Sequence, residues 1–370
     1  MLRTAQKGLR FLWGLARAHS AAEVASNPSL KRMHAFLASE QLRRTTATGA
    51  PNINDLWWAS KDVDAMRLNI KSLGYEMARG VYERAPRHPA PTPVHIGLRS
   101  KPATQADMES EWAAHWCRSL RVAPLYHRKV WEYVFVLQAL FEAGVLKAGE
   151  RMLGFGCGDE PVPSYLASLG VHVTATDLPL DKARARGWAT GQQDPSGLDR
   201  LWKPEICERD AFRGFVDVRS ADMNHIPASL AGFSATWSIC ALEHLGSIER
   251  GTEFVENSLR VLRPGGVAVH TTEYNFSPGE ETIDNWQTVL FKRSHLEELA
   301  RRLRSLGHDV APLDFSLGSG LLDRFIDLPP YAAGEGLLDD RWNDLSPAHL
   351  KLSIDGFPCT SFGLVVRKDR

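Results

Sequence analysis

The chain has 370 residues, of which 44% are hydrophobic and 24% are charged, and its formal net charge is zero. This length allows one large core with additions, and the composition is that of a globular protein. The balanced charge gives no electrostatic reason for a nucleic-acid partner, so none is expected. The five cysteines include no Cys-x-x-Cys pair, which argues against a disulfide framework and suits a reducing compartment such as the cytoplasm.

The first 44 residues depart from this balance, because they carry eight lysines and arginines against two glutamates. Leu9, Leu12, Trp13 and Ala16 recur there at roughly helical spacing. A helix packed on the protein's own surface is the favoured interpretation. Peripheral contact of residues 1–20 with an anionic membrane and a transit peptide are the alternatives. No apolar run is long enough to span a bilayer, so we expect a cytoplasmic protein, with membrane association left open.

Helices dominate the first part of the sequence. Residues 1–125 are predicted to form an N-terminal helical or cap region, with a proline-rich linker at 85–95 and a helix at 109–123. A stronger apolar face predicts a helix over 127–146.

From about residue 150, short apolar strands alternate with helices, which argues for a parallel sheet covered on both faces. The predicted helices cover 161–169, 247–262 and 294–306. The predicted strands cover 151–155, 171–176, 215–219, 234–239, 266–272, 309–315 and 361–367.

The segment LGFGCGDE (153–160) has the form of a glycine-rich turn between a strand and a helix. It fails the dinucleotide fingerprint, because Asp159 or Pro161 stands where the last glycine is required. Asp159 and Glu160 would also repel a phosphate at the positive end of the helix. A cationic ligand without phosphate, such as S-adenosylmethionine, suits this turn better.

The strands after this turn end in residues that suit the binding of an adenosine. A strand ends on Asp177, 21 residues after Gly156, where a carboxylate can accept both hydroxyls of a ribose. Asp222 and Met223 end the next strand, as a polar and apolar pair suited to an adenine. The segments ALEHL (241–245) and VLRPGG (261–266) come after them.

Together these segments resemble the class I S-adenosylmethionine-dependent methyltransferases, including a bacterial branch with members associated with polysaccharide assembly. The resemblance implies an α/β, Rossmann-like fold with a seven-stranded, mostly parallel sheet, an N-terminal helical region and cap insertions. It implies a cofactor-binding core at 126–315, and an insertion plus a final sheet strand at 316–370. S-adenosyl-L-methionine is the implied cofactor and S-adenosyl-L-homocysteine the product. The implied cofactor-binding residues are Gly154, Phe155, Gly156, Gly158, Glu160, Asp177, Leu178, Asp222, Met223, Ser238 and Ile239.

Two positions depart from the family pattern. The family often has an acid where Gly154 stands and a third glycine where Glu160 stands. Without that acid, the methionine ammonium lacks its expected anchor, and Asp159 or Glu160 is the candidate replacement.

Methyl transfer is an in-line displacement, so alignment of the acceptor supplies much of the rate, and a hydroxyl acceptor needs a base. Acceptors are expected at the carboxyl ends of the fourth and fifth strands. His244 is the first candidate base there, followed by Glu273 and His270, with Glu243 beside them. Some relatives bind a divalent cation through Glu-x-x-Glu-His, but Cys240 stands at the first of these positions, so no metal is predicted.

The acceptor is less well defined by the sequence. The segments 178–214 and 316–355 contain tryptophans, arginines and acids that suit either sugar binding or an ordinary lid. We expect O-methylation of a sugar, a glycan or a small molecule. The alternatives are N- or C-methylation of a metabolite, and a cofactor-binding scaffold without catalysis. Oligomeric state is left open.

Overall fold

The computed structural model describes residues 28, 30–35, 53–178, 198–329, 331 and 348–369. The chain forms two compact units, Met1–Asn69 and Ile70–Arg370. Helix α4 (Ile53–Arg84) begins in the first unit and ends in the second. The predicted amphipathic segment 1–20 and the cap residues 179–197 and 332–347 lie outside the described residues.

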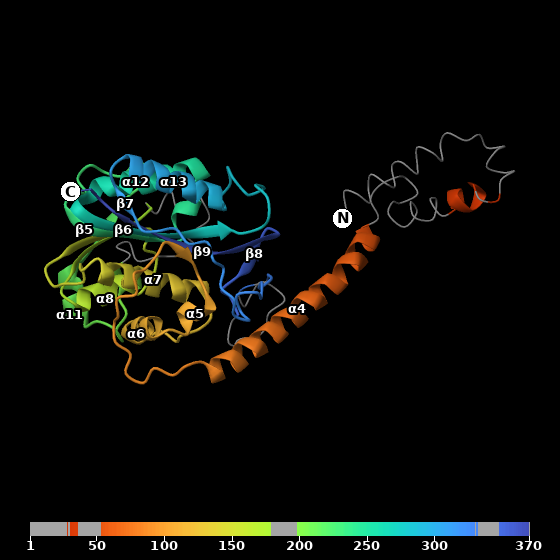
Figure 1. The fold of residues 1–370 in the computed structure, drawn as a ribbon, viewed down its shortest axis with the longest axis horizontal. Coiled ribbons are helices and arrows are strands. Elements are labelled where there is room, and N and C mark those ends of the chain that lie inside the picture. Colours follow the sequence, from red (N-terminus) through yellow and green to blue (C-terminus); the bar gives the residue numbers. More distant parts are fainter. Residues whose placement is uncertain are drawn as a thin grey trace. The chain divides into compact units, whose positions relative to one another are not determined.

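A twisted sheet forms the centre of the second unit (Figure 1). Its strand order is β1-β9-β6-β5-β2-β3-β4, with β7 and β8 also paired to β9. Strands β2 to β6 pair in parallel, whereas β9 runs antiparallel to β6. This mostly parallel sheet confirms the expected Rossmann-like α/β fold. The strands are β1 (Lys101–Pro102), β2 (Arg151–Phe155), β3 (His172–Asp177), β4 (Val216–Ser220), β5 (Phe233–Ile239), β6 (Leu262–Asn275), β7 (Asp309–Val310), β8 (Leu352–Ile354) and β9 (Phe357–Arg367).

The sheet has nine described strands rather than seven. Strands β1 and β8 have two and three residues, too few for an alternating pattern to reveal them. Strand β7 keeps only two residues of the predicted 309–315. The two long strands β6 and β9 instead extend beyond their predicted limits, because they pair with each other along nine residue pairs from Val267 to Asn275.

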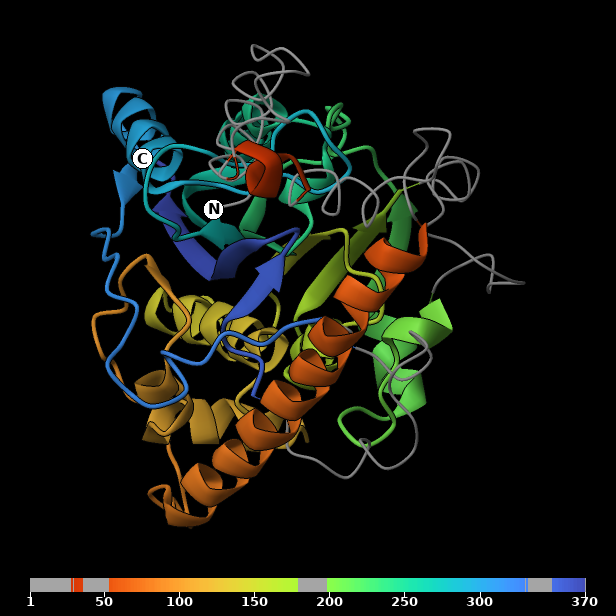
Figure 2. The same ribbon diagram turned by 90° about the vertical axis from the view of Figure 1, so that its right-hand side faces the viewer.

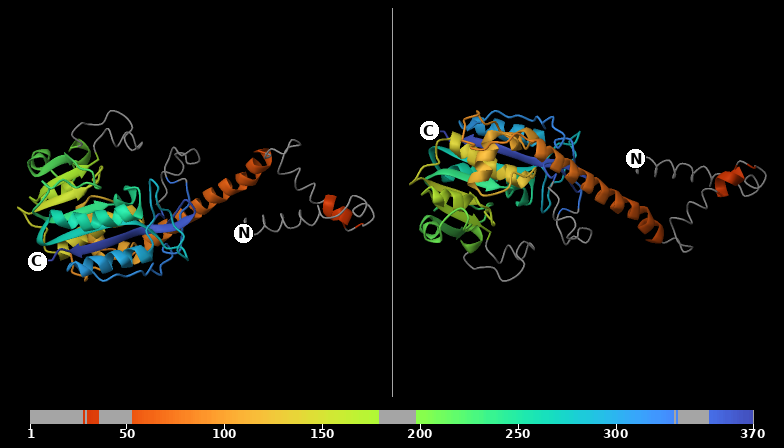
Figure 3. Two further views of the ribbon diagram at one scale, coloured as in Figure 1. Left: turned by 90° about the horizontal axis from the view of Figure 1, so that it is seen from above. Right: turned by 90° about the horizontal axis from the view of Figure 1, so that it is seen from below.

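Helices cover both faces of the sheet, and each face has its own apolar core. Figures 1 and 2 show α5, α6, α7, α8 and α11 on one side and α12 and α13 on the other, and Figure 3 shows the two faces from above and below. The helices are α5 (Gln105–Met108), α6 (Glu111–Ser119), α7 (Arg128–Glu142), α8 (Val162–Ser168), α10 (Leu198–Leu201), α11 (Arg209–Phe215), α12 (Ile248–Ser258) and α13 (Arg293–Ser305), with short 3-10 turns η1 (Leu242–His244) and η2 (Leu259–Val261).

Helix α7 shows how the sequence positions the site. Its apolar residues, such as Trp131, Phe135 and Leu137, are fully buried against the sheet. Its first turn carries Arg128 and Lys129 instead, and His127 caps it by accepting a hydrogen bond from the Lys129 amide. The charged start of α7 therefore lies at the edge of the sheet where the functional side chains gather.

Within the described part of the chain, no helix combines the length and the apolar character needed to cross a membrane. The domain limits at 125 and 315 stay a prediction.

Candidate functional site

A cavity of about 140 Å³ opens where four parallel strands end. Open α/β sheets bind ligands at this edge, beside the point where the strand order reverses, which lies here between β2 and β5. The cavity is lined by Gly156, Asp177, Leu178, Ala221, Asp222, Met223, Cys240, Ala241, His244 and Leu245.

Gly156 brings backbone close to this cavity. Its φ of 63° lies in the left-handed region, which favours glycine. A Cβ at this position would lie 2.8 Å from the Cβ of Ala241. The glycine is therefore required both by the turn and by the close approach of the segment after β5.

Glu160 is held away from solvent by Trp237. The indole Nε1 donates a hydrogen bond of 2.6 Å to Oε1 of Glu160. Glu160 is only 5% exposed. Burial raises the pKa of this carboxyl to about 8, although the hydrogen bonds from Trp237 and Cys157 oppose the shift. At neutral pH Glu160 is mostly uncharged, so the predicted repulsion of phosphate rests on Asp159 rather than on both acids.

Two acids mark the ends of neighbouring strands. Asp177 ends β3, and its carboxylate accepts a hydrogen bond from the Leu178 amide at 2.8 Å. Its side chain is 44% exposed and lines the cavity. Asp222 follows β4, and its Oδ1 accepts a hydrogen bond from the Asn224 amide at 3.0 Å. These contacts fix both carboxylates at the cavity.

The structure places the other predicted cofactor residues around this cavity rather than in its lining. Phe155 is fully buried against Phe254, and the Ser238 hydroxyl is hydrogen-bonded to His270 on the neighbouring strand β6. The lining residues that sequence reasoning missed as cofactor contacts are Ala221, Cys240, Ala241 and Leu245. Their position directly after β4 and β5 could have predicted them, because ligands bind at the carboxyl ends of these strands. Gly154, Gly158, Glu160 and Ile239 also lie outside the lining.

His244 stands between two cavities. With Leu245 it lines the first cavity and also a second one of about 320 Å³, which Gly246, Arg250, Asn285, Trp286 and Gln287 complete. Its Nδ1 lies 3.1 Å from the carbonyl oxygen of Gln287. Because a carbonyl can only accept, the Gln287 contact favours a proton on Nδ1, and the Thr288 hydroxyl oxygen, 3.2 Å from the same nitrogen, can also accept from it.

His270 is not brought to either cavity. Its two ring nitrogens lie 2.8 Å from Ser238 Oγ and 2.9 Å from Ser258 Oγ. Burial lowers the pKa of this imidazole to about 3. The ring is a neutral, hydrogen-bonded part of the core beneath α12.

Charged and polar side chains form a partly buried cluster beside the first cavity. The cluster contains Arg128, Lys129 and Glu132 of α7, Cys240 and Glu243 after β5, and Glu273 of β6. Arg128 Nη1 lies 2.5 Å from Glu273 Oε1 and 3.3 Å from Glu132 Oε1. Lys129 Nζ lies 2.9 Å from Glu132 Oε2, and Cys240 Sγ lies 3.1 Å from Glu132 Oε1.

The two glutamates nearest the strand ends each have a carboxylate oxygen that can still accept a hydrogen bond. Glu243 Oε1 and Glu273 Oε2 are buried and have no hydrogen-bond partner among the described residues. Burial raises the pKa of Glu273, and the charge of Arg128 offsets this only in part. For Glu132, burial is outweighed by the charges of Lys129 and Arg128, so its pKa is lowered.

The same cluster contains a candidate cation site. Ligand atoms of Cys240, Glu243 and Glu273 lie within 4.8 Å of one another. However, Arg128 Nη1 is 2.5 Å from Glu273 and 3.5 Å from Cys240 Sγ. A guanidinium already supplies the positive charge there and would repel a metal ion, so we propose none.

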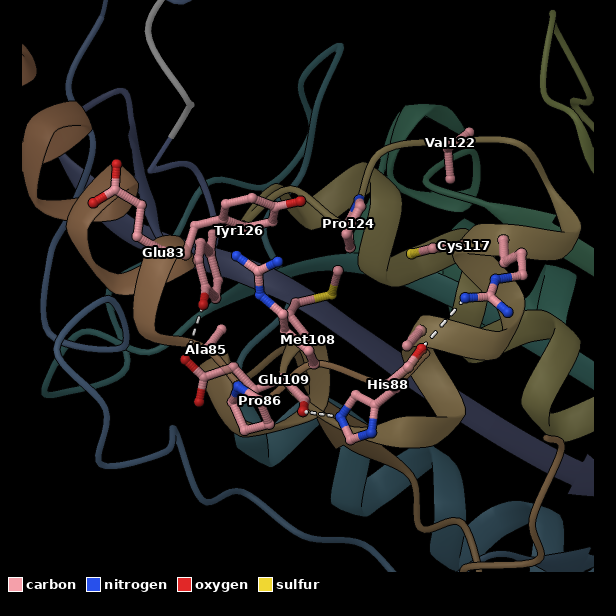
Figure 4. Close-up of a pocket in the computed structure, with 14 residues that line it drawn as sticks. Glu83, Ala85, Pro86, His88, Met108, Glu109, Cys117, Val122, Pro124 and Tyr126 are labelled. Carbon is pink, nitrogen blue, oxygen red and sulfur yellow. Dashed lines mark hydrogen bonds between the residues drawn. The ribbon is translucent and has the colours of Figure 1, made fainter. Parts of the chain in front are cut away.

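A third cavity, of about 520 Å³, is lined by residues 82, 83 and 85–88, and by residues of α5, α6 and the segment that follows α6. Figure 4 shows His88 and Tyr126 both turned toward Glu109, to which they are hydrogen-bonded. None of the sequence-predicted site residues lines this cavity.

Comparison with known proteins places the glycine turn and its cavity in a known family. Residues 153–270 match the family model described as a methyltransferase domain. The matched range begins in β2 and ends in β6, and it includes all ten residues that line the first cavity. No curated protein matched the sequence.

Several solved structures are similar to this chain. A proposed sarcosine dimethylglycine methyltransferase from Galdieria sulphuraria is 16% identical, with a TM-score of 0.40 over 65% of this chain and 84% of that one. A phosphoethanolamine N-methyltransferase from Haemonchus contortus is 18% identical, with a TM-score of 0.38 over 63% of this chain and 52% of that one. These values are too low to transfer a substrate or a residue role.

Proposed function

The chain belongs to the class I S-adenosylmethionine-dependent methyltransferases, and from this premise we propose that it methylates a hydroxyl group of a sugar, a glycan or another small polar acceptor. Its cofactor is S-adenosylmethionine, which supplies a methyl group on a sulfonium. The observation that carries the proposal is the second cavity, which meets the cofactor cavity at His244.

The first cavity fits the cofactor by the chemistry of its lining. Gly156 lines the cavity with bare backbone, and Asp177 offers a carboxylate to the two ribose hydroxyls. Met223 offers an apolar wall and Asp222 a polar edge for the adenine. Glu160 is the proposed replacement for the missing acid at 154, since an arriving ammonium would favour its ionised form.

The second cavity has the character of a sugar site. Trp286 is 60% exposed, which is unusual for a tryptophan without a partner surface. Arg250, Asn285 and Gln287 surround it with hydrogen-bonding groups. An indole face beside such groups suits the apolar face and the hydroxyls of a sugar ring.

His244 is the proposed general base. It lies on the boundary of both cavities, where its imidazole would accept the proton of the attacking hydroxyl. Glu273 and Glu243 are second candidates, because each keeps a buried oxygen without a described partner. Trp286 and Arg250 would orient the acceptor. Alignment of the acceptor with the methyl group increases the rate of transfer.

Calorimetry with S-adenosylmethionine, S-adenosylhomocysteine and NAD tests the cofactor half of the proposal. Both adenosyl ligands should bind, NAD should not, and Asp177→Ala should weaken the adenosyl ligands at least tenfold. Asp217→Ala is the matched control, because Asp217 is an exposed aspartate on β4 outside the cavity. Unchanged affinity in Glu160→Gln would exclude Glu160 as the ammonium anchor.

A screen of sugars and small hydroxylated acceptors for S-adenosylhomocysteine formation tests the acceptor half. Trp286→Ala should raise the KM of an active acceptor, and His244→Asn should lower kcat while leaving cofactor affinity intact. Cofactor binding without turnover of any acceptor would favour the scaffold alternative. Turnover of amines alone would favour N-methylation.

A further inference from the structure

The two cavities that meet at His244 differ in charge. The described lining of the first cavity contains two aspartates, Asp177 and Asp222, and no lysine or arginine. The described lining of the second contains one arginine, Arg250, and no aspartate or glutamate. An acidic lining suits the sulfonium and the ammonium of S-adenosylmethionine, and by the same reasoning a basic lining suits an anion.

The side chain of Arg250 is available to a ligand. Its backbone amide donates a hydrogen bond of 3.1 Å to Ser247 Oγ, which holds the residue in the first turn of α12. Arg250 is exposed, and its guanidinium has neither a hydrogen bond nor an ion pair with any residue that the structure describes. A guanidinium presents its donors as a planar fork that matches two oxygens of a carboxylate or a phosphate.

The two walls of the second cavity are joined to each other. Asp284 Oδ1 accepts hydrogen bonds from the Ile248 amide at 2.8 Å and from the Asn285 amide at 2.7 Å. This one oxygen therefore connects the start of α12, which carries Arg250, to the loop that carries Trp286. Asp284 itself is not part of the described lining. A site whose walls are fixed in advance loses less conformational entropy when its ligand binds.

Arg250 also lies close to the boundary with the cofactor cavity. A Cβ at Gly246 would lie 3.2 Å from Arg250 Nη1. Gly246 follows His244 and Leu245, which line both cavities. An anionic group bound by Arg250 would therefore lie beside the segment that the two cavities share.

Given the proposed methyl transfer, on which this inference rests, we propose that the acceptor is a sugar that carries an anionic group and that Arg250 binds this group. The group is a carboxylate, as in a uronic acid, or a phosphate, as in a sugar phosphate. Trp286 contacts the apolar face of the same sugar ring. Arg250 determines which acceptor is bound and takes no part in proton transfer.

Calorimetry of the protein loaded with S-adenosylhomocysteine tests the preference for an anion without requiring turnover. The probes are glucose, glucuronate and glucose 6-phosphate, which share a ring and differ in charge. At least one of the two anions should bind about tenfold more tightly than glucose, because a hydrogen bond to a charged group is stronger than one to a neutral group. The anion that binds more tightly distinguishes a carboxylate from a phosphate.

Two variants test the role of the arginine. Arg250→Gln should remove the difference between the anions and glucose, since the amide keeps hydrogen-bonding capacity and loses the charge. Arg260→Gln is the matched control and should keep the difference, because Arg260 is exposed on η2 outside the cavity. Equal affinity for all three sugars, binding of none of them, or a preference that survives in Arg250→Gln would overturn the proposal.

Turnover separates this proposal from the proposed function. A preference for anions that depends on Arg250, without formation of S-adenosylhomocysteine from S-adenosylmethionine, would support the anion site and count against methyl transfer. Methyl transfer to neutral sugars that is as efficient as transfer to charged ones would support the proposed function and overturn the anion site.

Discussion

At the scale of single residues, Gly154, Trp237 and Glu160 depend on one another. The glycine leaves room for the indole, and the indole N–H binds the glutamate carboxyl. Sequence comparison alone shows two departures from a family pattern. The structure shows them joined through Trp237, which sequence reasoning did not single out.

Gly154→Ala should destabilise the protein by about 1–3 kcal/mol, because the added methyl group would force the packed side chains of Cys157 and Trp237 to shift. The added Cβ would lie 2.4 Å from Cys157 Sγ and 2.5 Å from Cζ2 of Trp237. Urea unfolding of the variant measures this. Gly214→Ala in α11 is the control, since nothing lies within 4 Å of a Cβ there and no loss is expected. Equal stabilities of the two variants would refute the packing account.

Glu160 should make stability depend on pH. Its pKa is raised from 4.5 to about 8 in the folded chain, so between these values the folded state holds a proton that the unfolded state has released. Stability should therefore fall as pH rises through this window, by up to about 1.4 kcal/mol per pH unit. Unfolding of wild type and Glu160→Gln from pH 5 to 8 measures the effect, as the difference between their curves. Curves that stay parallel would contradict it.

At the scale of elements, the start of α7 connects to the ends of β5 and β6 through charges. Glu132 and Cys240 are in contact although they lie 108 residues apart in the chain. The sequence predicted α7 from its apolar face, but a helical pattern does not reveal what the charged first turn meets. That contact depends on how α7 packs across the sheet.

Arg128→Met should destabilise the protein by about 3–5 kcal/mol, because it leaves the buried Glu273 without its counter-charge and Glu132 with Lys129 alone. Glu273 and Glu132 both lie within ion-pair distance of Arg128. The double variant Arg128→Met/Glu273→Gln should recover part of the loss, since a neutral amide then replaces the unpaired carboxylate. Denaturant unfolding of both variants measures this, and equal losses would speak against the pairing.

At the scale of the whole molecule, ligand binding should be visible as added stability of the second unit. At a hundred times its Kd, S-adenosylhomocysteine should add about 2.7 kcal/mol to the free energy of unfolding. Thermal unfolding with and without ligand measures this. NAD at the same concentration is the control, and an equal shift with NAD would count against the adenosyl site.

The sequence by itself determined the parallel sheet, the glycine turn and the acids at the strand ends. Strand alternation is a local pattern, and the carboxyl ends of parallel strands meet at one edge, so Gly156, Asp177 and Met223 could be placed together in advance. Only the tertiary structure decided that His270 is buried between two serines, that Arg128 pairs with both Glu132 and Glu273, and that Trp286 borders a cavity shared with His244. These arrangements join residues far apart in the chain, and their energies come from burial and from charge pairing across elements, which no local pattern records.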